Sequence, residues 1–172
     1  MPATKKLKLS DYLASKIRDI PDFPKKGIVF KDITPLLADA KALKLAVDAI
    51  ADKFAAEKPA LVIGAEARGF ILGPAIATRL GAGFIPVRKP GKLPYRTKKT
   101  SYALEYGTDT LEIHEDAVRR KQKCLLVDDL LATGGTMQAC CKMVREMGGQ
   151  IVGCAFLIEL AFLPGRAKLK PH

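Results

Sequence analysis

The sequence predicts an α/β fold with a mainly parallel sheet, and two observations support this prediction. Segments typical of buried strands alternate with segments typical of amphipathic helices, which is the order of parallel sheets with crossover helices. Two of the strands run into polar loops, GAEARG and DDLLATGGT. Because such sheets bind ligands beyond the carboxyl ends of their strands, we expect a site at these two loops.

The elements follow from hydrophobic spacing and from glycine. Leu43, Val47, Ile50 and Phe54 recur at helical spacing within residues 38–54, which therefore form an amphipathic helix. The other expected elements are a short buried strand over 60–63, a helix over 71–83, a strand over 84–89, a strand over 123–131, a helix over 136–149 that ends at two glycines, and a buried strand over 151–160.

The segment between the second and third of these strands has a different character. PGKLPYRTKKTSYALEYGTDTLEI contains two prolines, two glycines and several basic residues, with weak alternation near its end. We expect a long mobile loop over about 90–110, followed by a short strand arm. Long loops in compact domains usually carry function.

Length and composition indicate one soluble domain over residues 1–172. The chain has 48% hydrophobic and 27% charged residues, which is ordinary for a globular protein. No apolar run approaches the ~18 residues of a membrane span, and the first residues lack the apolar core of a secretion signal. We expect a cytoplasmic protein whose four cysteines are small buried thiols, in preference to a disulfide or zinc framework.

The net charge of +11 indicates an anionic partner. Nucleic acid and a highly phosphorylated small molecule are both consistent with it. The basic residues form several short clusters, each of which is more often a solvated surface than a site, so charge alone does not decide between them.

The loop after the strand KCLLVDDLL has the composition of a phosphate cradle. Its backbone N–H groups and the start of the following helix favour an anion, and two threonine hydroxyls can donate as well. Asp128 and Asp129, at the end of the strand, suit hydroxyl groups or a metal ion instead. A phosphate beside a vicinal diol indicates a ribose 5-phosphate. The cradle consists of Ala132, Thr133, Gly134, Gly135 and Thr136.

Other readings of these motifs have weaker support. A hydrophobic strand ending in two aspartates also occurs in nucleoside triphosphatases, but the sequence has no GxxxxGK[ST] motif. GAGFIP contains a GxG without the third glycine of a dinucleotide site. The remaining alternative is a purely structural turn, in which the two aspartates have no function.

LLVDDLLATGGT resembles the phosphoribosyl pyrophosphate (PRPP) signature of the type I phosphoribosyltransferases. The segments PDFPKKGIVFKDITPLL, GAEARGFILGPAIA, VRKPGKLP and SYALEYG resemble, in order and spacing, the adenine phosphoribosyltransferase family. The resemblance runs from about residue 20 to residue 166. It implies the type I fold, with a small N-terminal hood over about 1–36, a core over about 37–172, and the mobile catalytic loop.

The resemblance assigns the PRPP site. The cradle would hold the 5-phosphate, and Asp128 and Asp129 the ribose hydroxyls. Arg68 would be catalytic, within a pyrophosphate loop that often carries a cis peptide in this family. The other residues implied for pyrophosphate are Ala65, Glu66, Ala67, Gly69, Arg88, Lys89 and Lys92.

The resemblance also assigns the base site. Phe30 would stack on adenine, the backbone of Val29 and Lys31 would recognise its N1 and N6 edge, and Leu160 would close the opposite face. Phe30 and Leu160 could instead be ordinary residues of the hydrophobic core, without a role in binding a base. Lys26 stands where the family commonly has proline, a departure that loosens the turn of the hood.

Glu105 and Tyr106 fall in the expected mobile loop. Glu105 would exchange a proton with the purine near N7, and Tyr106 would cover the site. The implied reaction transfers phosphoribose from PRPP to N9 of adenine, which gives AMP and pyrophosphate in purine salvage. Mg²⁺ would be carried by PRPP, without a metal site made by the protein.

The resemblance further implies a homodimer, in which a basic residue of VRKPGK reaches the neighbouring site. This use of positive charge needs no nucleic acid. Two alternatives stay open: a phosphoribosyltransferase for xanthine, another purine or orotate, and a PRPP-sensing regulator that binds nucleic acid. The regulator would need an added helix-turn-helix domain, and only about twenty residues precede the segment PDFPKKGIVFKDITPLL.

Overall fold

The computed structural model describes residues 8–103 and 108–171 and divides the chain into two compact units, residues 1–49 and 50–172. The first unit therefore extends past the expected hood boundary near residue 36. The element α3 begins in this unit and ends in the second. The role of residues 1–36 as a hood stays a prediction.

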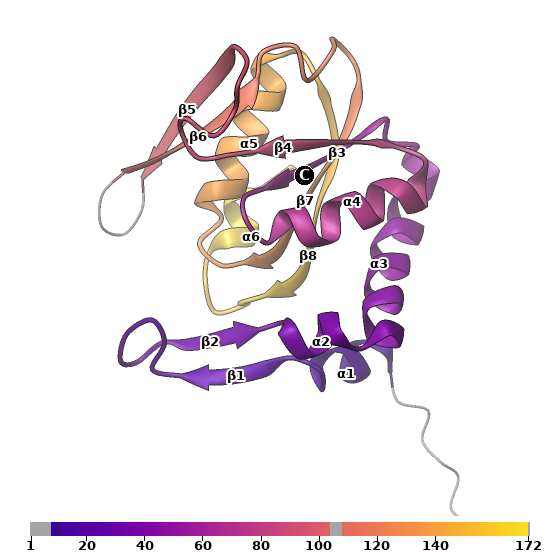
Figure 1. Cartoon of the computed structure of the whole chain (residues 1–172), viewed down its shortest axis with the longest axis vertical. Helices are drawn as coiled ribbons and strands as arrows, with labels where there is room; N and C mark the ends of the chain where they lie inside the picture. Colours follow the sequence, from indigo (N-terminus) through magenta and orange to yellow (C-terminus); the bar gives the residue numbers. More distant parts are fainter. Residues whose placement is uncertain (1–7, 104–107, 172) are drawn as a thin grey trace, which may run out of the picture. The chain divides into compact units, whose positions relative to one another are not determined.

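The first unit contains a two-stranded antiparallel hairpin (Figure 1). Ile20 lies opposite Phe30 in its register, and the turn is closed by the Gly27 N–H, which donates to Asp22 Oδ1 at 2.7 Å. The turn that contains Lys26 is thus fixed by a side-chain acceptor. The elements are α1 (Leu9–Ala14), β1 (Arg18–Pro21), β2 (Val29–Asp32), α2 (Thr34–Ala38) and α3 (Ala40–Phe54).

The second unit is built on a parallel sheet in the order β4-β3-β7-β8. Both β3 and the first half of β7 are buried on both faces, as expected for strands covered by helices on either side. Its elements are η1 (Ala55–Glu57), β3 (Leu61–Ala65), α4 (Gly69–Leu80), β4 (Gly83–Val87), β5 (Thr97–Ala103), β6 (Thr108–His114), β7 (Lys123–Leu131), α5 (Gly135–Glu146), β8 (Gln150–Glu159) and α6 (Gly165–Lys168).

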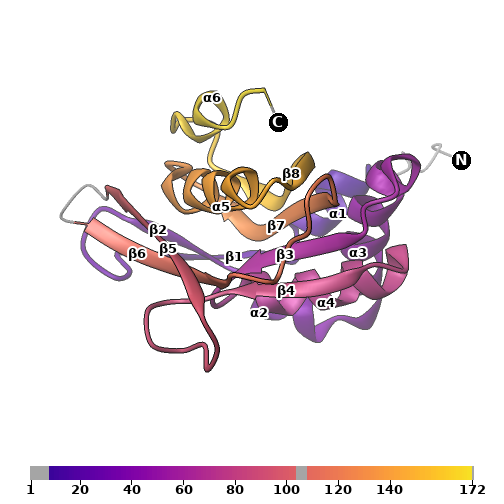
Figure 2. The ribbon, with the colours of Figure 1, turned by 90° about the horizontal axis from the view of Figure 1, so that it is seen from above.

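The connections of this sheet determine where a site can form. From β3 the chain crosses through α4 to β4 on one side, and from β7 it crosses through α5 to β8 on the other. Since both crossovers take the right-handed sense, α4 and α5 lie on opposite faces of the sheet (Figure 2). The two chain paths diverge between β3 and β7, and this divergence opens a crevice at their carboxyl ends.

Glycine permits close packing beside this crevice. A Cβ on Gly64 of β3 would lie 2.8 Å from the backbone oxygen of Gly69, the first residue of α4. A Cβ on Gly69 would lie 3.1 Å from the backbone oxygen of Val127 in β7. The two glycines therefore let the start of α4 approach both strands at the edge where the site is expected.

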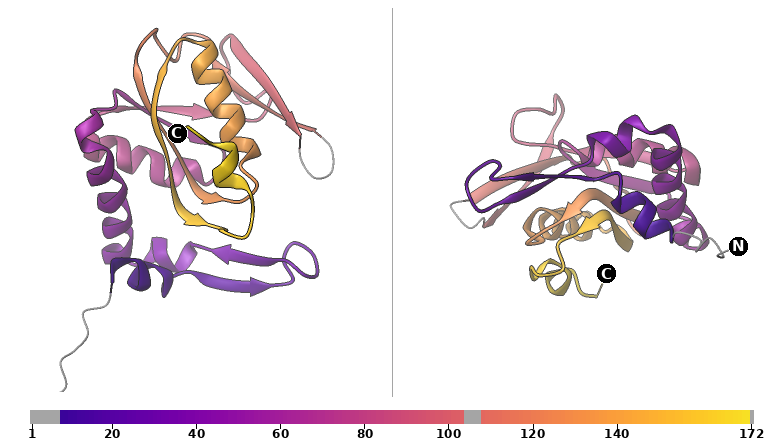
Figure 3. Two further views of the ribbon diagram at one scale, coloured as in Figure 1. Left: turned by 180° about the vertical axis from the view of Figure 1, so that it is seen from behind. Right: turned by 90° about the horizontal axis from the view of Figure 1, so that it is seen from below.

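The expected loop over about 90–110 is wrong at residues 97–103 and 108–110, which form strands. Residues 97–103 form β5 and pair antiparallel with β6 from residue 108 onward, and this hairpin lies beside α5 (Figure 3). The reason is alternation: Thr100 is buried between the exposed Lys99 and Ser101. Both prolines and one of the two glycines that suggested a loop lie within residues 90–94, and the other glycine, Gly107, lies outside the described residues.

Two smaller expectations were tested by the same structure. Cys124, Cys140 and Cys141 are buried and Cys154 is half-buried, each as a free thiol. Among the helices of the described residues, none has the length and apolar character needed to span a membrane.

Candidate functional site

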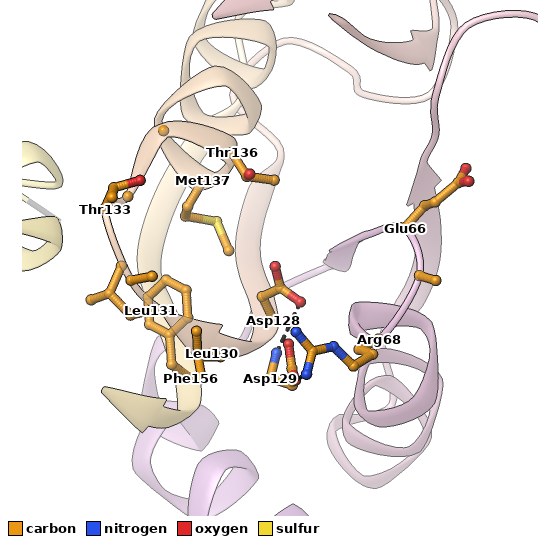
Figure 4. Close-up of a pocket in the computed structure, with 14 residues that line it drawn as sticks. Glu66, Arg68, Asp128, Asp129, Leu130, Leu131, Thr133, Thr136, Met137 and Phe156 are labelled. Carbon is orange, nitrogen blue, oxygen red and sulfur yellow. Dashed lines mark hydrogen bonds and ion pairs between the residues drawn. The ribbon is translucent and has the colours of Figure 1, made fainter. Parts of the chain in front are cut away.

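A cavity of about 260 Å³ lies at the carboxyl ends of β3 and β7 (Figure 4). It occupies the crevice that the strand order creates. Its wall is made by the loop after β3, by the end of β7 with the start of α5, and by one residue of β8. The lining residues are Glu66, Ala67, Arg68, Asp128, Asp129, Leu130, Leu131, Ala132, Thr133, Gly134, Gly135, Thr136, Met137 and Phe156.

All five residues of the predicted phosphate cradle line this cavity. Gly134 precedes α5 with φ +80°, a conformation that favours glycine. A Cβ there would also lie 2.9 Å from the backbone oxygen of Gly165. The cradle leads into a helix of 12 residues, whose first N–H groups and dipole favour an anion.

The two adjacent aspartates and Arg68 meet on the other side of the cavity (Figure 4). Arg68 Nη1 lies 2.9 Å from Asp129 Oδ2, and the side chain of Asp129 is only 4% exposed. The backbone N–H of Asp129 donates to Asp128 Oδ1 at 2.9 Å. A cation and two carboxylates thus face a cradle for an anion, which gives the cavity two chemically different ends.

Burial dominates the protonation of this acid pair. Burial, followed by the charge of Asp129, raises the pKa of Asp128 to about 7 from an ordinary value of 3.8. Burial also raises the pKa of Asp129, although the Arg68 guanidinium opposes that shift. Two like charges in one desolvated place resist joint ionisation, so added hydrogen-bond donors or a cation would favour the charged pair.

The loop after β3 is shorter than expected. Ala65 is the last residue of β3 and Gly69 the first of α4, so the connection consists of residues 66–68. Of the five predicted residues, Glu66, Ala67 and Arg68 line the cavity, whereas Ala65 and Gly69 do not. The peptide bond between Glu66 and Ala67 is cis, as the resemblance implies.

The side chain of Glu66 binds the neighbouring basic segment. Its Oε2 accepts from Arg88 Nε at 3.1 Å and from the Lys89 N–H at 3.0 Å. Burial raises the pKa of Glu66, but these donors together bring it below its usual range. Arg88, Lys89 and Lys92 do not line the cavity; Arg88 lies against Glu66, and the side chains of Lys89 and Lys92 are exposed.

Glu112 was missed by the sequence analysis. This β6 carboxylate is 2% exposed; its Oε1 lies 2.8 Å from Lys99 Nζ, and its Oε2 accepts from the Gly91 N–H at 3.3 Å. It therefore holds the segment that carries Lys89 and Lys92. Because neighbouring residues of a strand point to opposite faces, the apolar Leu111 and Ile113 on either side gave no sign that Glu112 is buried as well.

The remaining lining residues were also missed, since they are apolar. Phe156 of β8 lies opposite Asp128 in the parallel register, and residues in register share a face of the sheet. The sequence carries no sign that distinguishes this residue from a core phenylalanine. The same holds for Leu130, Leu131 and Met137.

The predicted base-site residues belong to different parts of the chain. Val29, Phe30 and Lys31 lie on β2 of the first unit, where Phe30 packs edge-on against Phe23 with ring centroids 5.2 Å apart. Leu160 follows β8 in the second unit, and its N–H donates to Leu131 O. Glu105 and Tyr106 lie outside the described residues.

Replacement of Asp128 by asparagine tests the burial of the acid pair. Since its pKa is raised, the native state binds more protons than the unfolded state between about pH 4 and pH 7, and the free energy of unfolding falls as pH rises through that window. Asp128→Asn should remove this dependence and raise the free energy of unfolding at pH 8, relative to pH 5, by on the order of 1–3 kcal/mol.

Urea unfolding at the two pH values measures the effect. Asp116→Asn is the matched control, because Asp116 is exposed in a turn and its loss removes the same charge. An equal stability change at pH 5 and pH 8 for Asp128→Asn would contradict the raised pKa.

Comparisons with known proteins agree with this geometry. The profile of the phosphoribosyl transferase domain matches residues 34–170. The adenine phosphoribosyltransferase of Geobacter metallireducens is 63% identical over 159 residues, which cover 92% of this chain and 93% of the relative.

Solved structures agree as well. The crystal structure of adenine phosphoribosyltransferase from Thermoanaerobacter pseudethanolicus superposes with a TM-score of 0.92 at 53% identity, covering 95% of each chain. The Saccharomyces cerevisiae enzyme, crystallised with an imino-altritol bisphosphate and adenine, superposes with a TM-score of 0.90 at 36% identity, covering 94% of each chain. The predicted type I fold and the resemblance are confirmed: the chain belongs to the phosphoribosyltransferase family, among the adenine phosphoribosyltransferases.

Proposed function

We propose that this protein transfers the 5-phosphoribosyl group of PRPP to N9 of adenine, which yields AMP and pyrophosphate in purine salvage. One observation carries the proposal: an anion cradle and a buried acid pair line the same cavity at the switch point of the sheet. Ribose 5-phosphate carries a phosphate, which suits the cradle, and a diol, which suits the acid pair. The relatives named as adenine phosphoribosyltransferases support the choice of base.

PRPP would lie across the cavity. The cradle over residues 132–136 takes the 5-phosphate, and Asp128 and Asp129 accept from the ribose hydroxyls. Arg68 and the backbone of residues 66–68 take the pyrophosphate, in line with the place of this loop at the cavity wall. Arg68 lies within 2.9 Å of Asp129, so one cation can serve both the leaving group and the acid pair.

Mg²⁺ is the expected companion of PRPP. The described residues contain no cluster of three or more His, Cys, Asp or Glu side chains that could hold a metal alone. Asp128 and Asp129 offer the oxygen donors that Mg²⁺ prefers, and the oxygens of PRPP would complete its shell. When bound, the ion neutralises charge on the departing pyrophosphate.

Adenine would be held by the β2 strand and by Leu160. Val29 and Lys31 are two residues apart on β2, so their backbone groups point to the same edge of the strand. Val29 is 49% exposed, and the Phe30 ring is braced by Phe23. The backbone pair would read the 6-amino edge while Phe30 stacks on the ring.

Glu105 and Tyr106 complete the proposed reaction. Pyrophosphate leaves C1 of the ribose with its bonding electrons, and N9 attacks the opposite face. As N9 forms its bond to C1, the carboxylate of Glu105 accepts the proton that adenine carries on N7, and Tyr106 covers the site. Exclusion of water protects PRPP from hydrolysis. The two residues join β5 to β6, whose hairpin lies beside α5.

The basic segment is assigned to a homodimer. Lys89 and Lys92 are exposed and do not line the cavity of their own chain, which is consistent with a role at the neighbouring site. Glu66 and Glu112 hold the backbone of this segment in place, since they accept from the N–H groups of Lys89 and Gly91. We expect the protein in the cytoplasm, with small-molecule partners and without nucleic acid.

Turnover with different bases tests the proposal. With PRPP and Mg²⁺, adenine should give AMP and pyrophosphate, whereas hypoxanthine, guanine, xanthine and orotate should react far more slowly. A 6-oxo base leaves backbone groups unpaired, at a cost of about 1–3 kcal/mol for each group. Chelation of Mg²⁺ should abolish the product. Equal rates with hypoxanthine or orotate would contradict the assignment of adenine as the substrate. Tight DNA binding at physiological salt would support the alternative of a regulator that binds nucleic acid.

Glu105→Gln tests the acid–base role. Glutamine has nearly the shape of glutamate but cannot take the proton, so kcat should fall roughly 10²–10⁴-fold while PRPP affinity is retained. Glu115→Gln is the control, because Glu115 is an exposed carboxylate beyond the end of β6. A Glu105→Gln enzyme within about twofold of the parent, where chemistry limits turnover, would leave catalysis to Mg²⁺, Arg68 and positioning.

The dimer is tested by sedimentation and by mixing. Lys89→Ala and Asp129→Ala variants should each have low activity, and mixed dimers should regain part of it, because one of their two sites is intact when Lys89 acts on the partner. A fully active monomer at assay concentration, or mixtures without any recovery, would contradict action across the interface. Lys92→Ala in the same experiment identifies which lysine crosses.

A further inference from the structure

Tyr102 joins the phosphate cradle to the β5-β6 hairpin, and neither the sequence analysis nor the proposed reaction assigns it a role. Its phenol oxygen lies 3.2 Å from Thr136 Oγ1, which donates to it. The phenol in turn donates to Asp109 Oδ2 at 3.3 Å. Tyr102 lies opposite Asp109 in the hairpin register, and its ring packs against the core of the second unit.

The chain of contacts continues to the basic segment. Asp109 Oδ2 lies 3.6 Å from Lys89 Nζ, and Asp109 Oδ1 accepts from the Thr110 N–H at 2.8 Å. A relay of side chains thus connects the 5-phosphate end of the cavity with a lysine of the pyrophosphate segment. Its members come from α5, β5, β6 and the segment after β4.

The number of available protons makes this relay sensitive to a bound phosphate. Each hydroxyl has one proton to donate, and a fully ionised phosphate can only accept. If the Thr136 hydroxyl donates its hydrogen bond to the phosphate, it no longer donates to Tyr102. The Tyr102 hydroxyl can then rotate and donate to Thr136 Oγ1. This keeps the hydrogen bond between the two residues, but Asp109 loses the donor that Tyr102 supplied. Asp109 is left to Lys89 and Thr110.

We propose that Tyr102 is a positioning residue for PRPP: it orients the Thr136 hydroxyl toward the 5-phosphate. When a phosphate occupies the cradle, Tyr102 also withdraws its hydrogen bond from Asp109, which changes the contacts that Asp109 makes with Lys89. The inference rests on the proposed function, which places the 5-phosphate at Thr136. Tyr102 does not contact the reacting atoms in this scheme. Its hydroxyl acts through Thr136, and its ring serves packing alone.

A double-mutant cycle with ribose 5-phosphate separates the hydroxyl from the ring. Tyr102→Phe keeps the ring and removes the hydroxyl, so the fold should be retained. Calorimetry should show affinity for ribose 5-phosphate reduced roughly 3–10-fold, the range for one hydrogen bond. In a Thr136→Val background, the same change should cost less than about twofold, because its partner is gone. In a Thr136→Ser background, which keeps a hydroxyl, the loss should return.

The control comes from the same hairpin. Ser101 Oγ and Thr110 Oγ1 form a hydrogen bond of 2.9 Å on its exposed face, and neighbouring residues of a strand point to opposite faces. Ser101→Ala should therefore leave the affinity for ribose 5-phosphate within the error of the parent value. Tyr102→Phe should also raise the KM for PRPP by the same factor as the dissociation constant, with the KM for adenine changed by less than about twofold, a selectivity that a general loss of stability would not give.

The outcomes distinguish the inference from the function beneath it. A parent protein that does not bind ribose 5-phosphate overturns both. A parent that binds, together with Tyr102→Phe at parental affinity, overturns the inference alone. Equal losses from Tyr102→Phe in the parent and in the Thr136→Val background would show that the tyrosine acts without the threonine, and would overturn it as well.

Discussion

The parallel pairing of β3 with β7 is the constraint on which the rest of the structure depends. Its register sets Gly64 beside Val127, so the site-forming loops begin at the same edge of the sheet. The chain then leaves in opposite directions, through α4 and α5 (Figure 2). The residues that follow the two strands face one another across the crevice. Arg68 meets Asp129 for this reason, although the two residues are far apart in the sequence.

This arrangement creates an electrostatic cost that a ligand can offset. Asp128 and Asp129 are adjacent, desolvated and raised in pKa, with Arg68 as the cation beside them. A buried charge without sufficient partners destabilises the native state. In the proposed reaction, ribose hydroxyls and a divalent cation would provide the missing partners, and their binding would stabilise the ionised pair. The acids are held in place before the ligand arrives, since burial and the Asp129 N–H fix them.

Most of the fold could be predicted because it depends on spacing. The strand over 123–131 has the expected bounds, and the helix after it was expected within three residues at each end. The cradle and the acid pair follow from the same motif. β5 could not be predicted, because Thr100 lies between the charged Lys99 and the polar Ser101 and β5 packs against α5, which the local sequence does not show. Of this hairpin, only a short strand arm after the loop was expected. Ion pairs such as Glu66 with Arg88 join separate segments, so residue type gave no sign that Arg88 pairs with a carboxylate of its own chain and lies outside the cavity lining. Phe156 and Glu112 required the register of neighbouring strands.

A crystal structure of the protein with ribose 5-phosphate tests the central claim most directly. The account predicts the phosphate on the backbone N–H groups of residues 132–136 and on the Thr136 hydroxyl, with the 2- and 3-hydroxyls of the ribose within hydrogen-bond distance of Asp128 and Asp129. A sugar phosphate bound elsewhere on the protein would contradict it, as would one with its phosphate against Arg68 and its hydroxyls at the cradle.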